Sequence, residues 1–143
     1  MGTILFASDL DNTLLFSHRH RQPEDRCVER LNGAEQGFFT RETPDLLPQV
    51  VQRVHLLPIT TRSIEQYQRI QWPDGTAPRI ALTANGAVLL RDGQVQLLGS
   101  DCHGMEHRPP RIGSAAAYIR SHLGDGVLER IDTLAASLLC AEI

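Results

Sequence analysis

The sequence feature that most constrains the fold is a short apolar segment that ends abruptly at two carboxylates. Residues Ile4 to Ala7 are apolar, and the polar run Ser8-Asp9-Leu10-Asp11-Asn12-Thr13 follows directly. A short apolar run bounded in this way is typical of a buried parallel strand. In parallel α/β sheets, ligands collect at the carboxyl ends of the strands. The segment therefore predicts a first strand with Asp9 and Asp11 at a ligand-binding edge.

Helix and strand signals alternate beyond this segment. Residues 16–36 are polar, with a turn signal at Gly33, and indicate an excursion over the surface. Thr43 is expected to cap a helix that has Pro44 at its first position. Leu56 to Ile59 predict a second strand, in which Pro58 favours an edge or strand-end position.

The next elements continue this alternation. Ser63 and Gln66 form a capping box, which predicts a helix to about Ile70. An α/β fold with a parallel sheet flanked by helices is therefore expected. The remaining strands are predicted at Ile80 to Thr83 and, around an Asp92-Gly93 turn, as a hairpin of Ala87 to Leu90 and Val95 to Leu98.

The composition changes after Gly99, which suggests an internal boundary. We expect a core at 1–98, a linker at 99–111 and a helical segment at 112–143, with helices from Ala115 to Leu123 and from Val127 onward. Linker residues Cys102, His103 and His107 fall short of a four-ligand zinc pattern, so a solvated linker is favoured over a metal site.

The charge and composition exclude several classes of protein. The formal net charge of -3 argues against a nucleic-acid-binding surface. No stretch approaches the roughly 18 apolar residues of a membrane span, so a cytoplasmic protein without a membrane partner is expected. Three widely spaced cysteines indicate free thiols rather than disulfides. All 14 basic residues are arginines, so no lysine ammonium is available within this chain.

Two carboxylates at positions i and i+2 can divide the work of phosphoryl transfer. One can attack phosphorus, while the other protonates the leaving oxygen and later deprotonates water. A divalent cation is needed beside them, because carboxylate and phosphate repel each other. The alternative is that Asp9 and Asp11 only cap a loop, since Asp and Asn favour turns for local hydrogen-bonding reasons.

The strand followed by Asp9-Leu10-Asp11-Asn12-Thr13-Leu14 resembles the first motif of the haloacid dehalogenase superfamily. The resemblance implies that Asp9 is a nucleophile forming an aspartyl-phosphate and that Asp11 is the general acid and base. It also implies that both residues bind Mg²⁺, Asp11 through its backbone carbonyl. Thr13 would help to hold the loop near the substrate.

Two later segments extend the resemblance. Leu57-Pro58-Ile59-Thr60-Thr61-Arg62 is similar to the second motif, which implies that the Thr60 hydroxyl binds the transferring phosphoryl group. Leu82-Thr83-Ala84-Asn85-Gly86-Ala87 is similar to a segment of the branch that includes Cof-type and sucrose phosphatases. Asn85 would then lie near the active site, although Asn-Gly is also an ordinary turn. Arg62 is expected to bind a substrate anion or to pair with a surface carboxylate.

The resemblance covers residues 1 to about 98. The third motif of the family supplies a Lys or Arg, and the fourth supplies acidic metal ligands. Gly124-Asp125 with Glu129 only superficially resembles the fourth motif, and Asp125 is expected to cap the last helix. We therefore expect 112–143 to be the start of an α/β cap or a remnant of one, with the C-terminal part of the core missing.

Two functions follow from this pattern. The first is a Mg²⁺-dependent phosphatase acting on a small phosphorylated metabolite, such as a sugar phosphate. The alternative is a non-catalytic or incomplete module that binds a phosphorylated ligand or a partner, because an unpaired sheet edge would favour association with a second copy or a completing chain.

Overall fold

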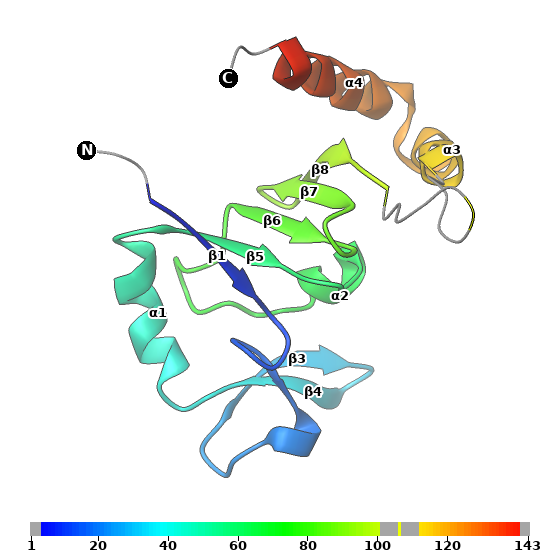
Figure 1. Ribbon diagram of the computed structural model, residues 1–143. Coiled ribbons are helices and arrows are strands. Elements are labelled where there is room, and N and C mark those ends of the chain that lie inside the picture. The colour runs from blue at the N-terminus through cyan, green and yellow to red at the C-terminus, as the bar shows by residue number, and fades with distance from the viewer. Residues whose placement is uncertain (1–3, 101–105, 107–111, 141–143) are drawn as a thin grey trace.

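The computed structural model describes residues 4–100, 106 and 112–140, which form two β-sheets and four α-helices (Figure 1). The larger sheet has five strands in the order β1-β5-β6-β7-β8, and the smaller has three in the order β2-β4-β3. The strands of the larger sheet are β1 (Leu5–Asp9), β5 (His55–Ile59), β6 (Ile80–Thr83), β7 (Val88–Arg91) and β8 (Gln94–Leu98).

The five-stranded sheet is mixed rather than parallel, so the expected class of α/β fold is confirmed but the expected sheet is only partly right. β1, β5 and β6 are parallel, whereas β6, β7 and β8 are antiparallel. The β7–β8 pairing follows from the predicted Asp92-Gly93 turn, where both residues have positive φ (49° and 77°), and the β6–β7 pairing follows from the turn at Ala84 to Ala87. The parallel strands are therefore confined to the half of the sheet that carries the candidate site.

Pro58 lies in an interior strand, which corrects the expectation of an edge. β5 is hydrogen-bonded to β1 on one side and to β6 on the other. Pro58 is the penultimate residue of β5, and the registered pairing of β5 with β6 consists of Ile59 with Leu82 alone. The strand-end position that was the other expectation therefore explains how the proline is tolerated.

The segment expected to be a surface excursion is a second sheet. It consists of β2 (Phe16–Ser17), β3 (Arg26–Leu31) and β4 (Ala34–Phe39), all antiparallel, with the short 3₁₀ helix η1 (His18–His20) after β2. The β3–β4 turn is Asn32-Gly33, with φ values of 52° and 82°. This dipeptide is a strong hairpin signal, because both residues accept the positive φ that a two-residue turn requires.

Four helices complete the described chain: α1 (Thr43–Val51), α2 (Ile64–Gln68), α3 (Ile112–Leu123) and α4 (Asp125–Cys140). Thr43 lies inside α1 and Glu42 is the N-cap, so the expected cap was one residue late. The Ser63 capping box is present with both reciprocal hydrogen bonds. Helix α4 packs against α3 and β8 at the far end of the sheet from β1 (Figure 1).

One apolar core lies under both sheets. Leu10, Leu56 and Ala81 enter it from the five-stranded sheet and its loops, while Val28 and Phe39 enter it from the small sheet. The Val28 carbonyl also accepts a hydrogen bond from the Gln71 amide at 2.7 Å. The small sheet is therefore fixed to the segment after α2 by packing and by main-chain bonding.

Some expectations concern residues that the structure does not describe. Cys102, His103 and His107 lie outside the described residues, as does most of the expected linker at 99–111. Cys27 is a free thiol, as predicted. In the described ranges, no helix is both long enough and apolar enough to cross a membrane.

Candidate functional site

Three backbone amides of the loop after β1 share one carbonyl acceptor. The amides of residues 13–15 all donate to the Leu10 carbonyl oxygen, at 3.3, 3.0 and 2.9 Å. The side chains of Leu10 and Leu15 are fully buried and anchor both ends of the loop in the core. Asn12 has φ 60°, a left-handed conformation that Asn adopts more readily than most residues. The position of Asp11 is thus fixed by the core beneath it.

The ends of β1 and β5 bring the first two motifs together. Asp9 is in register with Ile59 across the parallel pair, so the residues after each strand are neighbours. Thr60 is almost fully buried, and its Oγ1 donates to Oδ2 of Asp11 at 3.3 Å. The same hydroxyl oxygen accepts a hydrogen bond from the Arg62 amide at 3.1 Å. Asp11 and Thr60, which are 49 residues apart in the chain, are therefore in direct contact.

Asp9 is exposed at the end of its strand. Its Oδ1 accepts a hydrogen bond from the Leu10 amide at 2.7 Å. Among the residues that the structure describes, Oδ2 of Asp9 receives no hydrogen bond. One carboxylate oxygen is thus held by the loop while the other remains available to a ligand.

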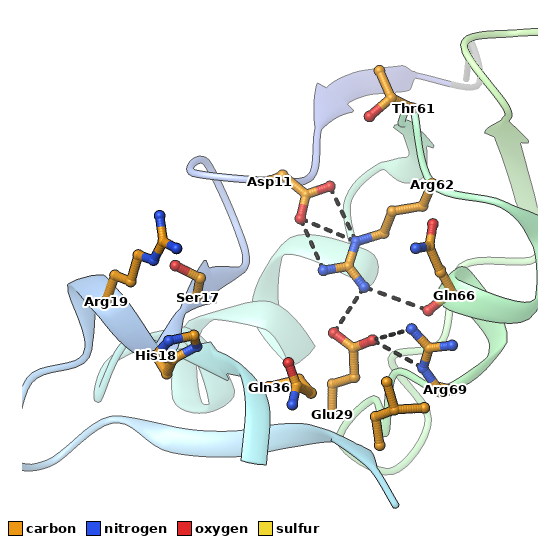
Figure 2. Close-up of a pocket in the computed structure, with 11 residues that line it drawn as sticks. Asp11, Ser17, His18, Arg19, Glu29, Gln36, Thr61, Arg62, Gln66 and Arg69 are labelled. Carbon is orange, nitrogen blue, oxygen red and sulfur yellow. Dashed lines mark hydrogen bonds and ion pairs between the residues drawn. The ribbon is translucent and has the colours of Figure 1, made fainter. Parts of the chain in front are cut away.

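Two nitrogens of Arg62 donate hydrogen bonds to the Asp11 carboxylate. Its Nε lies 3.0 Å from both Asp11 oxygens and its Nη2 lies 2.8 Å from Oδ1 (Figure 2). Burial alone would lower the pKa of Arg62, but the hydrogen bonds and charges of Asp11 and Glu29 together raise it above its ordinary value. Of the two alternatives expected for Arg62, the structure contains a carboxylate pairing, and the carboxylate belongs to the candidate site.

Glu29 is the site residue that sequence reasoning missed. It lies on β3 with only 3% of its surface exposed, and it bonds Nη1 of Arg62 (2.8 Å) and Nε of Arg69 (3.1 Å). The pairing register of β3 with β4 shifts on both sides of Glu29, and Gly37 lies opposite. Such irregularities re-aim side chains. The Asn32-Gly33 hairpin signal was available, but nothing in the sequence indicated a bulge at Glu29.

A cavity of about 570 Å³ opens between η1, the small sheet and α2. Of the predicted residues, Asp11 and Arg62 line it. Figure 2 shows Arg62 between Asp11 and Glu29, with Arg69 beyond Glu29. The lining consists mainly of polar and charged side chains: Asp11, Ser17, His18, Arg19, Glu29, Leu31, Gln36, Thr61, Arg62, Gln66 and Arg69.

The other predicted residues lie outside this lining. Thr13 is exposed, and its amide belongs to the loop around Leu10. Asn85 is exposed with φ 59°, and its amide donates to the Thr60 carbonyl at 3.0 Å. Because that bond ties the loop after β6 to the loop after β5, Asn85 lies beside the candidate site through its main chain.

The described residues offer an incomplete set of metal ligands. They contain no group of three or more His, Cys, Asp or Glu side chains able to hold a metal ion. Asp125, from the segment compared with the fourth motif, is exposed and pairs with Arg120 at 3.0 Å. However, Mg²⁺ is commonly bound by one or two carboxylates together with water and substrate phosphate oxygens. Oδ2 of Asp9 is the carboxylate oxygen that could serve in such a site, because both carboxylate oxygens of Asp11 are bonded to Arg62.

No family model matches the chain, and no curated protein sequence matches it significantly.

Proposed function

We propose that this chain is a phosphohydrolase of the haloacid dehalogenase type. Its substrate would be a small phosphorylated metabolite, such as a sugar phosphate, and Mg²⁺ its cofactor. The observation that carries the proposal is the contact between Thr60 and Asp11 at the ends of adjacent parallel strands. It supports the order and roles of the two motifs, because a nucleophile, an acid and a phosphoryl-binding hydroxyl would have to meet at one point.

The proposed reaction has two displacements. Oδ2 of Asp9 attacks phosphorus, the bond from phosphorus to the leaving oxygen breaks, and Asp11 gives its proton to that oxygen. Water then attacks the aspartyl-phosphate and passes a proton to Asp11, so that the bond between phosphorus and Asp9 breaks. The Thr60 hydroxyl would turn its single proton from Asp11 to the phosphoryl oxygens. Bound Mg²⁺ would neutralise charge between Asp9 and the phosphate.

Arg62 would have two tasks in this reaction. Because the chain has no lysine, an arginine or a histidine would have to supply any basic side chain that neutralises the attacked phosphate. Arg62 is suited to this task because it already lies 2.8 Å from Asp11. It would also have to release the Asp11 carboxylate before that group can take up and give a proton.

The test is phosphate release from 4-nitrophenyl phosphate with and without Mg²⁺. Asp9→Asn keeps the shape of the side chain and removes the nucleophile, so we expect turnover to fall at least about a thousandfold. Asp92→Asn is the matched control, because Asp92 is an exposed carboxylate of the β7–β8 turn. Mg²⁺-dependent turnover that survives Asp9→Asn would reject the proposal.

A second candidate function is a module that binds a partner chain. The observation that favours it is β1, which lies at the end of the sheet and pairs only with β5 in the described part of the chain. Ile4, Leu5 and Phe6 are 61%, 53% and 50% exposed. An exposed apolar edge strand is a template for pairing with another chain. The partner would be a second copy or a different polypeptide that completes the sheet.

A further inference from the structure

Glu29 holds two arginines at one wall of the cavity. Its Oε2 binds Arg62, and its Oε1 lies 3.1 Å from both Nε and Nη2 of Arg69 (Figure 2). The side chains of Arg62 and Arg69 are only 16% and 30% exposed. A buried carboxylate is costly unless it is paired and hydrogen-bonded, and here one carboxylate fixes the positions of two guanidinium groups.

The arrangement leaves positive charge facing the cavity. The lining contains three arginines and two carboxylates, so the arginines exceed the carboxylates by one. Both carboxylates, Asp11 and Glu29, are already bonded to Arg62. Arg19 belongs to η1, on another wall of the same cavity. The cavity therefore favours an anion over a neutral or cationic group.

Arg69 has N–H donors that are not used by Glu29. Its Nε donates to Oε1 of Glu29 and its Nη2 lies 3.1 Å from the same oxygen, whereas Nη1 bonds no other residue that the structure describes. A guanidinium has five N–H donors in a planar fork, which matches the oxygens of a carboxylate or a phosphate. Because Glu29 fixes one side of this fork, its other side is preorganised for a ligand.

We propose that Arg69, positioned by Glu29 beside Arg62, forms a second anion subsite in this cavity. The proposal rests on the proposed phosphohydrolase function and narrows its substrate class. The substrate would be a phosphomonoester that carries a second anionic group, either a carboxylate or another phosphate. The transferred phosphoryl group binds at Asp9 and Thr60, and the second anion binds Arg69.

The test compares matched substrates. Phosphate esters of ω-hydroxy acids with two, three and four carbons are each measured beside the corresponding carboxamide. The three chain lengths vary the separation between the phosphate and the second anion. Bisphosphates of the diols, measured beside their monophosphates, form a second arm. We expect kcat/KM to favour the anionic member by on the order of tenfold at one chain length, because charge-assisted hydrogen bonds are lost in the neutral member. The comparison that gives the larger ratio of kcat/KM, carboxylate against carboxamide or bisphosphate against monophosphate, identifies the anion that binds Arg69.

Variants show whether Arg69 is responsible for this ratio. In Arg69→Ala we expect the ratio of anionic to neutral substrate to fall to about one, and in Arg69→Lys to be partly retained, because an ammonium keeps the charge but not the fork. Glu29→Gln should also lower the ratio, since it loosens the fork. Arg79→Ala is the control, because Arg79 pairs with the exposed Asp92 and should leave the ratio unchanged.

The outcomes separate the two proposals. If 4-nitrophenyl phosphate is hydrolysed but the ratio is about one at every chain length in both arms, the subsite is rejected and the phosphohydrolase stands. If no ester is hydrolysed, the proposed function fails, and the subsite is decided by calorimetric titration with the same acids and amides. Tighter binding of the acids that disappears in Arg69→Ala supports the subsite, whereas equal Kd values overturn it.

Discussion

Gly37 lies directly opposite Glu29 in the β3–β4 pair, and a Cβ atom at Gly37 would come within 2.8 Å of Oε2 of Glu29. The same atom would lie 3.1 Å from Cβ of Glu29 and 3.2 Å from a methyl group of Leu15. Glycine at this position thus creates the space in which Glu29 reaches its two arginines. This relationship leads to the first prediction.

Gly37→Ala should lower the free energy of unfolding by about 1–3 kcal/mol, because the added methyl group overpacks this site. Urea denaturation measures the change. The control is Gly113→Ala on α3, where nothing lies within 4 Å of the added atom, and we expect it to be neutral or stabilising by up to about 1 kcal/mol. Equal effects of the two substitutions would contradict the tight packing of Gly37 against Glu29.

The buried Tyr67 should lower the free energy of unfolding at high pH. Its side chain is buried, its hydroxyl has no hydrogen-bond partner in the part of the chain that the structure describes, and burial raises its pKa to about 12 from an ordinary 10.0. Between pH 10 and 12 the unfolded chain therefore binds fewer protons at this residue than the folded chain does. Stability falls over that window, by roughly 2 kcal/mol for this group.

Tyr67→Phe should remove this part of the pH dependence. At neutral pH we expect unchanged or slightly higher stability, because a buried hydroxyl without a described partner is deleted while the ring contact with Trp72 is kept. Chemical denaturation at pH 7, 10 and 11 measures the difference. A pH profile above 10 identical to that of the unmodified protein would show that Tyr67 is not the titrating group.

The capping box at Ser63 stabilises the helix that carries the cavity residue Gln66 and leads into Arg69. Ser63→Ala should cost about 1 kcal/mol, because the Gln66 amide loses its acceptor. Ser137→Ala on α4 is the matched control and should be neutral or slightly stabilising, since alanine is the better helix former. Thermal unfolding of the two variants is the measurement, and a larger loss in the control would contradict the assignment.

The apolar edge of β1 should promote association if this chain binds a partner through it. Light scattering over a hundredfold range of concentration is expected to show dimers of the unmodified chain, and Phe6→Lys should shift the equilibrium toward monomer, because lysine on an edge strand opposes pairing. Leu123→Lys, at a residue of similar exposure on α3, should leave it unchanged. A strict monomer at all concentrations would count against pairing of two copies.

The sequence predicted the elements that depend on local signals. The Ser63 capping box, the β6 strand and the Asp92-Gly93 hairpin were found because each has a short-range physical cause. The positions of Asp9 and Thr60 at the ends of strands were also predicted, whereas the hydrogen bond from Thr60 to Asp11 is a finding of the structure. Their chemical roles stay predictions, since geometry alone does not fix them.

What the sequence could not predict depends on contacts between distant residues. Glu29 looked like one more charged residue in a polar segment, and only the β-bulge and Gly37 turn it toward Arg62. The small sheet was missed for a different reason. Its Asn32-Gly33 turn was visible, but the charged residues around it masked the apolar positions Val28 and Phe39 that enter the core.

Phe16, where the chain enters the small sheet, pairs with Phe38 near the point where the chain leaves it. The two ends of the segment therefore lie side by side. Asp9, Asp11 and Thr60 are supported by the parallel strands, whereas Glu29 is supported by this separate sheet. A swap of residues 16–39 for another hairpin would therefore replace one wall of the cavity, and it would have to keep the core contacts of Val28 and Phe39. The small sheet thus shapes the cavity, while its place in the shared core limits which hairpins could replace it.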